Sequence, residues 1–344
     1  MKRAGHSVRI QGRADIDRLL NQEAPSDWDA TALKALLKGL VDSPSDDAQN
    51  DIVLSIEQQL SLLLHPVQVE DVHVTVSGGP VWLSDQHIDG WLGTQGRQIV
   101  CSPHKAAALC HHLDGLAIGG AHLSVTTDNE VPLPHVRRED RARSRPRGST
   151  LWLPYSDDIG RISLTPRALA TAHATRLMTH SGVIFDPFCG LGGNAVAAAQ
   201  AGARVFAAEL DPHRYTLAQK NAEALHVSDR LSLVSGSGPD QIAKWSQNER
   251  QYALFLDPPW GGRDWDREQM NWDVLFGAYP ALISAMKGAT ATLMKLPRTF
   301  DTESLRFLKG TWTFTLELGD ESDHPADRVR FLCGLHRPSD EFKA

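Results

Sequence analysis

The feature that most constrains the fold is a regular alternation of short apolar strands and helices that begins near residue 182. An apolar run predicts a strand over 182–186, and the Ala-rich run after it predicts a helix over 194–201. A second strand and helix are expected over 204–209 and 213–225. Strands that alternate with helices form a mainly parallel sheet covered on both faces. This part of the chain is therefore predicted to be α/β.

The same sheet is expected to take its remaining strands from the rest of the chain, over 231–234, 252–257, 289–296, 311–318 and 329–336. Ligands of such sheets bind at the carboxyl ends of the strands, where the strand order reverses. Sequence motifs at the ends of the predicted strands are therefore the candidates for function.

The first motif, Asp186–Asn194, reads DPFCGLGGN and joins the first strand to its helix. Glycines let the backbone turn tightly and approach a ligand, and the helix N-terminus offers free N–H groups to a carboxylate. A glycine-rich turn alone is weak evidence, because dinucleotide-binding folds use similar turns. Here the third glycine of the dinucleotide pattern is missing and an acidic residue leads the turn.

Glu209 is predicted to end the second strand, about twenty residues after the glycine turn. A carboxylate at that place can accept hydrogen bonds from both hydroxyls of a ribose. A solvated acid at a strand end is the alternative, and the preceding glycine turn favours the ribose.

The third motif, Asp257–Gly262, reads DPPWGG and also stands at a strand end. Asp257 and the carbonyl of Pro258 can each accept a hydrogen bond from one exocyclic amine, and the prolines fix the backbone that carries these acceptors. Two acceptors on one NH₂ group direct its lone pair toward a methyl donor. Trp260 offers a flat face on which a base can stack.

These motifs together resemble those of the trimethylguanosine synthase family, the RNA cap guanine-N2 methyltransferases, over about Tyr155–Arg337. The Phe-Cys-Gly and Gly-Gly-Asn pieces of the glycine turn and the Pro-Pro-Trp-Gly-Gly piece match that family. Shorter likenesses are Ser163-Leu-Thr-Pro166, Asn221-Ala-Glu223 and Leu296-Pro-Arg298. The first 136 residues share nothing recognisable with it.

The resemblance implies a Rossmann-like class I methyltransferase fold with a seven-stranded, mainly parallel sheet. It implies S-adenosyl-L-methionine as cofactor and stacking of the target base on Trp260. Apart from the resemblance, we expect no metal: Cys101, His104, Cys110 and His111 have roughly metal-ligand spacing, but a predicted helix turns Cys110 and His111 to different sides. We expect the cofactor-binding residues to be Thr165, Asp186, Phe188, Gly190, Gly192, Asn194, Glu209, Ser237 and Asp257. The expected catalytic residues are Asp257, Pro258 and Trp260.

The chain departs from the family pattern at three places. Asp257 stands where the family usually has Ser, and Asp-Pro-Pro-aromatic is typical of enzymes that methylate adenine, guanine or cytosine amines. Ser237 stands where the family has an Asp that contacts the cofactor's adenine. Arg263 replaces a proline, and its cation can meet a substrate phosphate or pair with a nearby acid.

Three hypotheses of function follow. The first is N-methylation of guanine N2, in RNA or in a 7-methylguanosine cap-like nucleotide. The second is methylation of an adenine amine in RNA or DNA, or of a protein glutamine. The third is a cofactor-binding scaffold without activity, which the intact DPPW sequence argues against.

The chain has 344 residues, enough for two domains. We expect a small α+β domain over 1–136, which we associate with substrate recognition, an Arg-rich linker over 137–150, and the methyltransferase domain over 151–344. The linker is either a phosphate-gripping arm or a solvated connector. Its arginines are Arg137, Arg138, Arg141, Arg143, Arg145 and Arg147.

A net charge of −7 gives no general attraction to nucleic acid, so a phosphate site has to be a local basic patch. Without an apolar run of membrane-spanning length or a signal peptide, we expect a cytoplasmic protein that does not contact membranes. The four cysteines fit reduced thiols, and Cys189 is expected to be a packed residue rather than a nucleophile. Trp265 and Trp272 are either an aromatic wall for a base or ordinary core residues.

Overall fold

A computed structural model describes residues 71–129, 131, 151–260, 270–319 and 328–339. The chain divides into two compact units, Met1–Asp71 and Val72–Ala344, and the elements below belong to the second. The Arg-rich tract, Arg263 and Trp265 lie outside the described residues. The division of the chain at residues 136 and 150 therefore stays a prediction.

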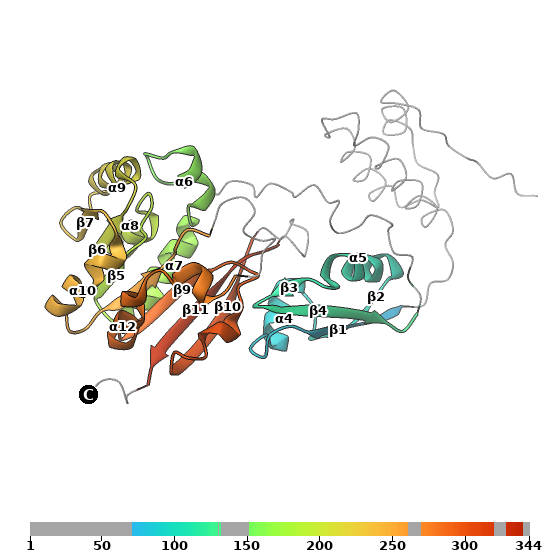
Figure 1. Cartoon of the computed structure of the whole chain (residues 1–344). Helices are drawn as coiled ribbons and strands as arrows, with labels where there is room; N and C mark the ends of the chain where they lie inside the picture. Colours follow the sequence, from blue (N-terminus) through green and yellow to red (C-terminus); the bar gives the residue numbers. More distant parts are fainter. Residues whose placement is uncertain (1–70, 130, 132–150, 261–269, 320–327, 340–344) are drawn as a thin grey trace, which may run out of the picture. The chain divides into compact units, whose positions relative to one another are not determined.

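A seven-stranded sheet forms the centre of the second unit, in the order β10-β11-β9-β8-β5-β6-β7 (Figure 1). Neighbours among β5 to β9 pair in parallel, whereas β11 is antiparallel to both β9 and β10. This is the class I methyltransferase arrangement, as predicted. The strands are β5 (Val183–Asp186), β6 (Arg204–Glu209), β7 (Leu231–Ser235), β8 (Ala253–Leu256), β9 (Ala291–Leu296), β10 (Gly310–Leu318) and β11 (Val329–Pro338).

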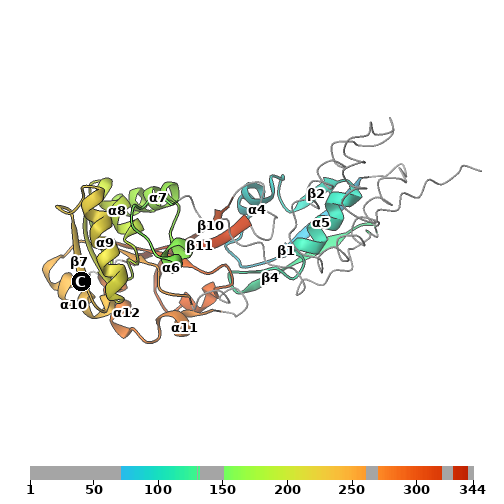
Figure 2. The ribbon, with the colours of Figure 1, turned by 90° about the horizontal axis from the view of Figure 1, so that it is seen from above.

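Helices cover both faces of this sheet (Figure 2). On one face pack α7 (Arg167–Met178), α8 (Gly193–Gln200) and α9 (Pro212–Ala224). On the other pack α10 (Gly238–Asn248) and α12 (Pro280–Gly288). Consecutive residues of a strand point to opposite faces, so β5 to β9 and β11 contribute to both apolar cores, whereas β10 contributes to one of them. Double coverage explains the nearly continuous apolar runs of β8 and β9.

The order of the strands places the switch point between β5 and β8. The chain runs from β5 outward to β6 and β7 and then returns to the other side of β5 to form β8. The ends of β5 and β8 therefore lie next to each other, at the position where open α/β sheets bind ligands. Asp186 ends β5, and Asp257 directly follows β8.

A second, antiparallel sheet precedes the methyltransferase sheet, in the order β2-β1-β4-β3. Its helix α5 packs on β1 and β4. This agrees with the expected α+β character of the region ahead of the linker. Its elements are β1 (Val72–Gly78), α4 (Asp85–Leu92), β2 (Gln98–Cys101), α5 (Pro103–Leu113), β3 (Ala117–Ile118) and β4 (Ala121–Thr127).

The turn between β3 and β4 is hydrogen-bonded to the segment after β9. The Gly119 amide donates to the Arg298 carbonyl at 2.9 Å, and the Thr302 hydroxyl donates to the Gly119 carbonyl at 3.1 Å. Trp82 donates its indole N–H to the Thr302 hydroxyl at 3.0 Å. The small sheet thus belongs to the same compact unit as the methyltransferase sheet. The short elements α6 (Asp158–Ser163), α11 (Trp272–Phe276) and η2 (Thr302–Leu305) complete the described chain.

Within the described part of the chain, no helix is both long enough and apolar enough to cross a bilayer.

Candidate active site

The turn after β5 needs glycine at two positions. Gly190 has a φ of 55° and Gly192 a φ of 83°, in the left-handed region that disfavours a side chain. Gly192 is the N-cap of α8, and its amide donates to the Cys189 carbonyl at 2.8 Å. The Cys189 amide donates to the Ala208 carbonyl of β6 at 3.0 Å, which fixes the turn beside the neighbouring strand. Cys189 itself is buried, and burial raises its thiol pKa well above the usual range, as a packed residue requires.

Glu209 lies directly against this turn. One carboxylate oxygen accepts from the Gly190 amide at 2.8 Å, and the other accepts from the Asp211 amide at 2.9 Å. A carboxylate oxygen has two lone pairs, so each can still accept a hydroxyl. The structure thus brings together two residues that the sequence placed at separate strand ends.

Asp186 is buried at the centre of the site, with 2% of its surface exposed. Burial raises its pKa to about 8, against a hydrogen bond of 3.3 Å from the Phe188 amide. The nearby carboxylates of Asp257 and Glu209 raise this pKa further, and the Lys295 ammonium lowers it. Two further acids and one cation therefore lie near Asp186.

Asp257 is paired with Lys295, the fifth residue of β9, which our sequence reasoning did not single out. The Lys295 ammonium donates to Asp257 Oδ2 at 2.8 Å. Burial raises the pKa of the Asp257 carboxyl, and the charge and hydrogen bond of Lys295 oppose that shift. The available signal was a single charged residue inside an otherwise uncharged strand.

Lys295 also reaches the segment ahead of α7. It donates to the Thr165 hydroxyl at 3.2 Å and to the Ser163 carbonyl at 3.4 Å. The Asn194 side-chain amide donates to the same Thr165 hydroxyl at 3.1 Å. The expected cofactor residues Thr165 and Asn194 are thus joined to each other and, through Lys295, to Asp257.

Ser237 stands at the N-cap of α10, where its hydroxyl makes no capping hydrogen bond. The next residue, Gly238, packs so closely on the glycine turn that a Cβ there would overlap the Pro187 carbonyl. The end of β7 is thereby held against the turn. Phe188 packs on Tyr279, with 5.6 Å between ring centroids.

Trp260 is partly buried beside the Asp257–Lys295 pair. The Lys295 ammonium lies 5.3 Å from its ring centroid, and the Phe331 ring lies 6.3 Å from it. Pro258 is buried. Trp272 is a core residue, 5% exposed and stacked on Phe276 at 4.7 Å between centroids. It therefore forms no wall for a base.

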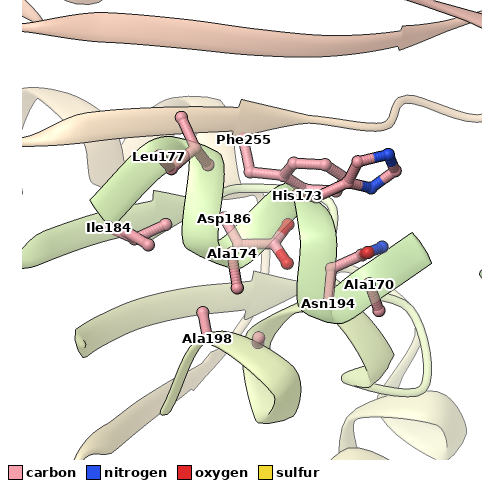
Figure 3. Close-up of a pocket in the computed structure, with 10 residues that line it drawn as sticks. Ala170, His173, Ala174, Leu177, Ile184, Asp186, Asn194, Ala198 and Phe255 are labelled. Atoms are coloured by element: carbon pink, nitrogen blue, oxygen red, sulfur yellow. The ribbon is translucent and has the colours of Figure 1, made fainter. Parts of the chain in front are cut away.

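A small cavity lies beside Asp186, bounded by α7, α8, β5 and β8, and is lined by His173, Asn194 and Phe255 (Figure 3). His173 Nε2 lies 3.6 Å from Glu317 Oε1, and within the described residues Asn194 Oδ1 has no hydrogen-bond partner. His173, Glu317 and Cys333 offer three ligand atoms within 4.8 Å of one another. These three residues are the candidate ligands of a metal ion. A thiol must be deprotonated to bind a metal, whereas burial raises the Cys333 pKa far above neutrality.

Residues 181–321 match the model of the RNA cap guanine-N2 methyltransferase family. The trimethylguanosine synthase of Saccharomyces cerevisiae is 29% identical over 160 residues, which cover 44% of this chain and 50% of that protein. A probable cobalt-precorrin-6B C(15)-methyltransferase of Pyrobaculum calidifontis is 35% identical over 79 residues, or 22% of this chain and 40% of that protein. The chain spans half or less of the length of these curated relatives.

Solved methyltransferases resemble the same part of the chain more distantly. An RNA methyltransferase from Salinibacter ruber in complex with S-adenosyl-L-homocysteine is 19% identical, with a TM-score of 0.32, and the match covers 51% of this chain and 94% of that one. An O-methyltransferase from Bacillus cereus is 12% identical, with a TM-score of 0.35, and the match covers 50% and 82%. The fold assignment therefore rests on the strand order described above, and the family assignment on the sequence match. Residues 181–321 thus form a domain that matches the RNA cap guanine-N2 methyltransferase family, a domain of the S-adenosylmethionine-dependent methyltransferase type.

Proposed function

We propose that this chain transfers a methyl group from S-adenosyl-L-methionine to an exocyclic amine of a nucleobase, with guanine N2 as the target. The observation that carries the proposal is the meeting of Asp186, Glu209 and Asp257 at adjacent strand ends, inside the segment that matches the family. The substrate is RNA or a 7-methylguanosine cap-like nucleotide.

The residues around the glycine turn fit the cofactor. Asp186 is a buried carboxyl group whose pKa is raised to about 8 chiefly by burial, and the positive charge of S-adenosylmethionine would favour its ionised form. Glu209 would hold the ribose hydroxyls, because each of its oxygens keeps a free lone pair. Ser237, with a hydroxyl that caps no helix, would bind on the adenine side. Phe188, Gly190, Gly192, Asn194 and Thr165 would shape the rest of the pocket.

When bound, the cofactor supplies an electrophilic methyl group on a sulfonium. Asp257 and the Pro258 carbonyl would accept the two hydrogens of the target amine and so aim its lone pair. Trp260 would stack on the base and fix its plane. An aryl amine is already neutral, so positioning and electrostatic alignment, rather than a strong base, would lower the barrier.

Asp257 also supports a second candidate, methylation of an adenine amine in RNA or DNA or of a protein glutamine. In both cases the same two acceptors would hold the amine.

The substrate phosphates would be bound by the arginines of residues 137–147, and the region ahead of them would contribute to substrate recognition.

A panel of substrates separates these candidates. Transfer of labelled methyl from S-adenosylmethionine would be measured on bulk RNA, guanine nucleotides, cap analogues, single-stranded DNA and a glutamine peptide. We expect incorporation into RNA or into guanine-containing nucleotides. Incorporation only into adenine-containing or peptide substrates would favour the second candidate. No incorporation into any of them, with intact cofactor binding, would favour a scaffold without activity.

A further inference from the structure

The Asp257–Lys295 ion pair is largely withdrawn from solvent. The Lys295 side chain is 6% exposed and that of Asp257 is 18% exposed, with 2.8 Å between Nζ and Oδ2. Removing one partner of a buried pair leaves an uncompensated charge, which is strongly destabilising. Each side chain thus fixes the place of the other.

All three donors of the Lys295 ammonium have partners in the structure: Asp257 Oδ2, the Thr165 hydroxyl and the Ser163 carbonyl. An ammonium has three N–H donors, so none is left for a substrate. Lys295 therefore connects β9 with the end of β8 and with the segment that leads into α7. That segment carries Thr165, which we place in the cofactor pocket.

The same ammonium lies near two aromatic rings, 5.3 Å from the Trp260 centroid and 4.9 Å from the Phe331 centroid. Attraction between a cation and an aromatic ring acts over this distance. The position of Trp260 and that of Asp257 thus depend on one atom, Lys295 Nζ.

We propose that Lys295 is the positioning residue of this site: it holds Oδ2 of Asp257 in an ion pair, so that Oδ1 stays open to the target amine beside Trp260. This inference rests on the proposed function, since it assigns Asp257 to the amine. It adds a residue that acts on the substrate only through Asp257 and Trp260.

Lys295→Met would be compared with Lys295→Arg, and with Lys244→Met as a control, because Lys244 is exposed on α10. In Lys295→Met we expect kcat to fall about 100-fold, the effect of an acceptor misplaced by about 1 Å, with a smaller change in KM. Lys295→Arg should recover part of the loss because it keeps the cation. Lys244→Met should match the wild-type protein.

The acid limb of the pH profile of kcat separates a positioning role from a purely structural one, because a loss of stability alone would not shift it. Asp257 is faced by Asp186 on β5, His173 on α7, Lys295 on β9 and Cys333 on β11. Loss of the Lys295 cation should move the acid limb to higher pH by about one unit or more, because a nearby opposite charge favours the ionised carboxylate. The kcat profiles would be measured at saturating cofactor, so that the effect of Asp186 on cofactor binding does not enter them. Wild-type kcat with an unmoved acid limb in Lys295→Met would overturn the proposal.

A double-mutant cycle tests the pairing of Asp257 with Lys295 without a measurement of turnover. Asp257→Asn, Lys295→Met and the double variant would be compared by thermal unfolding and by calorimetry of cofactor binding. The double variant should be more stable than the sum of the single losses predicts, because no unpaired charge remains. Strict additivity would overturn the proposal. If Lys295→Met alone fails to fold, a double variant that also fails to fold would overturn it, because removing the unpaired Asp257 charge should restore folding. A wild-type protein that methylates nothing in the substrate panel contradicts the proposed function, and the cycle still decides on Lys295.

Discussion

At the scale of single residues, three acids and one cation define the site. Asp186 and Asp257 are both withdrawn from water, and burial raises the pKa of each. Glu209 is instead held by the Gly190 and Asp211 amides. The three carboxylates therefore have different surroundings although they lie close together. This difference suits three separate tasks: contact with a cationic cofactor, with a ribose and with an amine.

Trp260 carries the prediction for substrate stacking. Trp260→Ala should lower turnover about 5- to 150-fold, because stacking contributes about 1–3 kcal/mol per base and 1.4 kcal/mol corresponds to a factor of ten. Cofactor affinity by calorimetry should stay near the wild-type value, since we place the indole on the substrate side. Trp272→Phe serves as a control, because Trp272 is packed in the core. Wild-type turnover in Trp260→Ala would remove the stacking role.

Asp186 predicts a pH-dependent cofactor affinity. Its pKa of about 8 means that the carboxyl is largely protonated at neutral pH, and a cationic ligand beside it favours the ionised form. Affinity for S-adenosylmethionine should therefore rise as pH increases toward 8 and level off above it. In Asp186→Asn only the titration of the ligand itself should remain. Identical profiles for the two proteins would contradict this assignment.

The raised pKa of Asp186 also determines how the free energy of unfolding changes with pH. A carboxyl with a folded-state pKa above its unfolded value binds more protons when folded. Its contribution to the free energy of unfolding is present below the unfolded pKa, about 3.9, and is lost as pH rises through about 8. Asp186→Asn should remove this part of the pH dependence.

At the scale of elements, the sequence pattern located the strands well. The predicted bounds of β6 coincide with the structure, and those of β10 differ by one residue. These segments are bounded by glycine, proline or polar residues that end an element locally. Helices α7, α10 and α12 were not predicted. In α7 an Ala-rich stretch with scattered polar residues shows no clear apolar stripe, so its burial is decided by the sheet it covers.

Some residues of the site could likewise be predicted from the sequence, and others could not. The glycine turn, Glu209 and Asp257 follow from local motifs at strand ends, which the strand order then brings together. Lys295 is 38 residues from Asp257 in sequence, and their contact depends on the pairing of β8 with β9. His173 likewise reaches the site through the packing of α7 on the sheet. Such partners become visible only after the tertiary structure is known.

The close packing of Gly238 leads to a prediction about the contact between α10 and the glycine turn. A Cβ at this position would overlap the Pro187 carbonyl, so Gly238→Ala should push the start of α10 away from the glycine turn. We expect a loss of about 1–3 kcal/mol in the free energy of unfolding, typical of overpacking, and weaker cofactor binding. The control is Gly90→Ala in α4, where nothing lies within 4 Å of the added Cβ. That variant should be neutral or more stable by about 0.5–1 kcal/mol. Equal stability of both variants would refute the close approach.

At the scale of the whole molecule, one compact unit joins the methyltransferase sheet with the small antiparallel sheet, through hydrogen bonds of Gly119 with Arg298 and Thr302. The proposed cofactor and substrate residues all lie in the methyltransferase part. RNA recognition at a distance from the base therefore has to come from other segments, and the Arg-rich tract is our candidate.

The Arg-rich tract predicts a salt effect. If residues 137–147 bind phosphates, the logarithm of RNA affinity should fall steeply with the logarithm of salt concentration, and replacing the six arginines with Gln should flatten that slope. Replacement of Arg204 and Arg230, exposed on the methyltransferase part, is the control. An unchanged slope in the Gln variant would leave the tract as a connector.

We propose that the ends of β5, β6 and β8 form a guanine-N2 methyltransferase site. Its most direct test is to digest the methylated product to nucleosides and identify the methylated atom by mass spectrometry, for the wild-type protein and for Asp257→Ala. We predict N2-methylguanosine from the wild-type protein, strongly reduced in Asp257→Ala although S-adenosylmethionine still binds. A methyl group on any other atom, or an undiminished yield from Asp257→Ala, would contradict it.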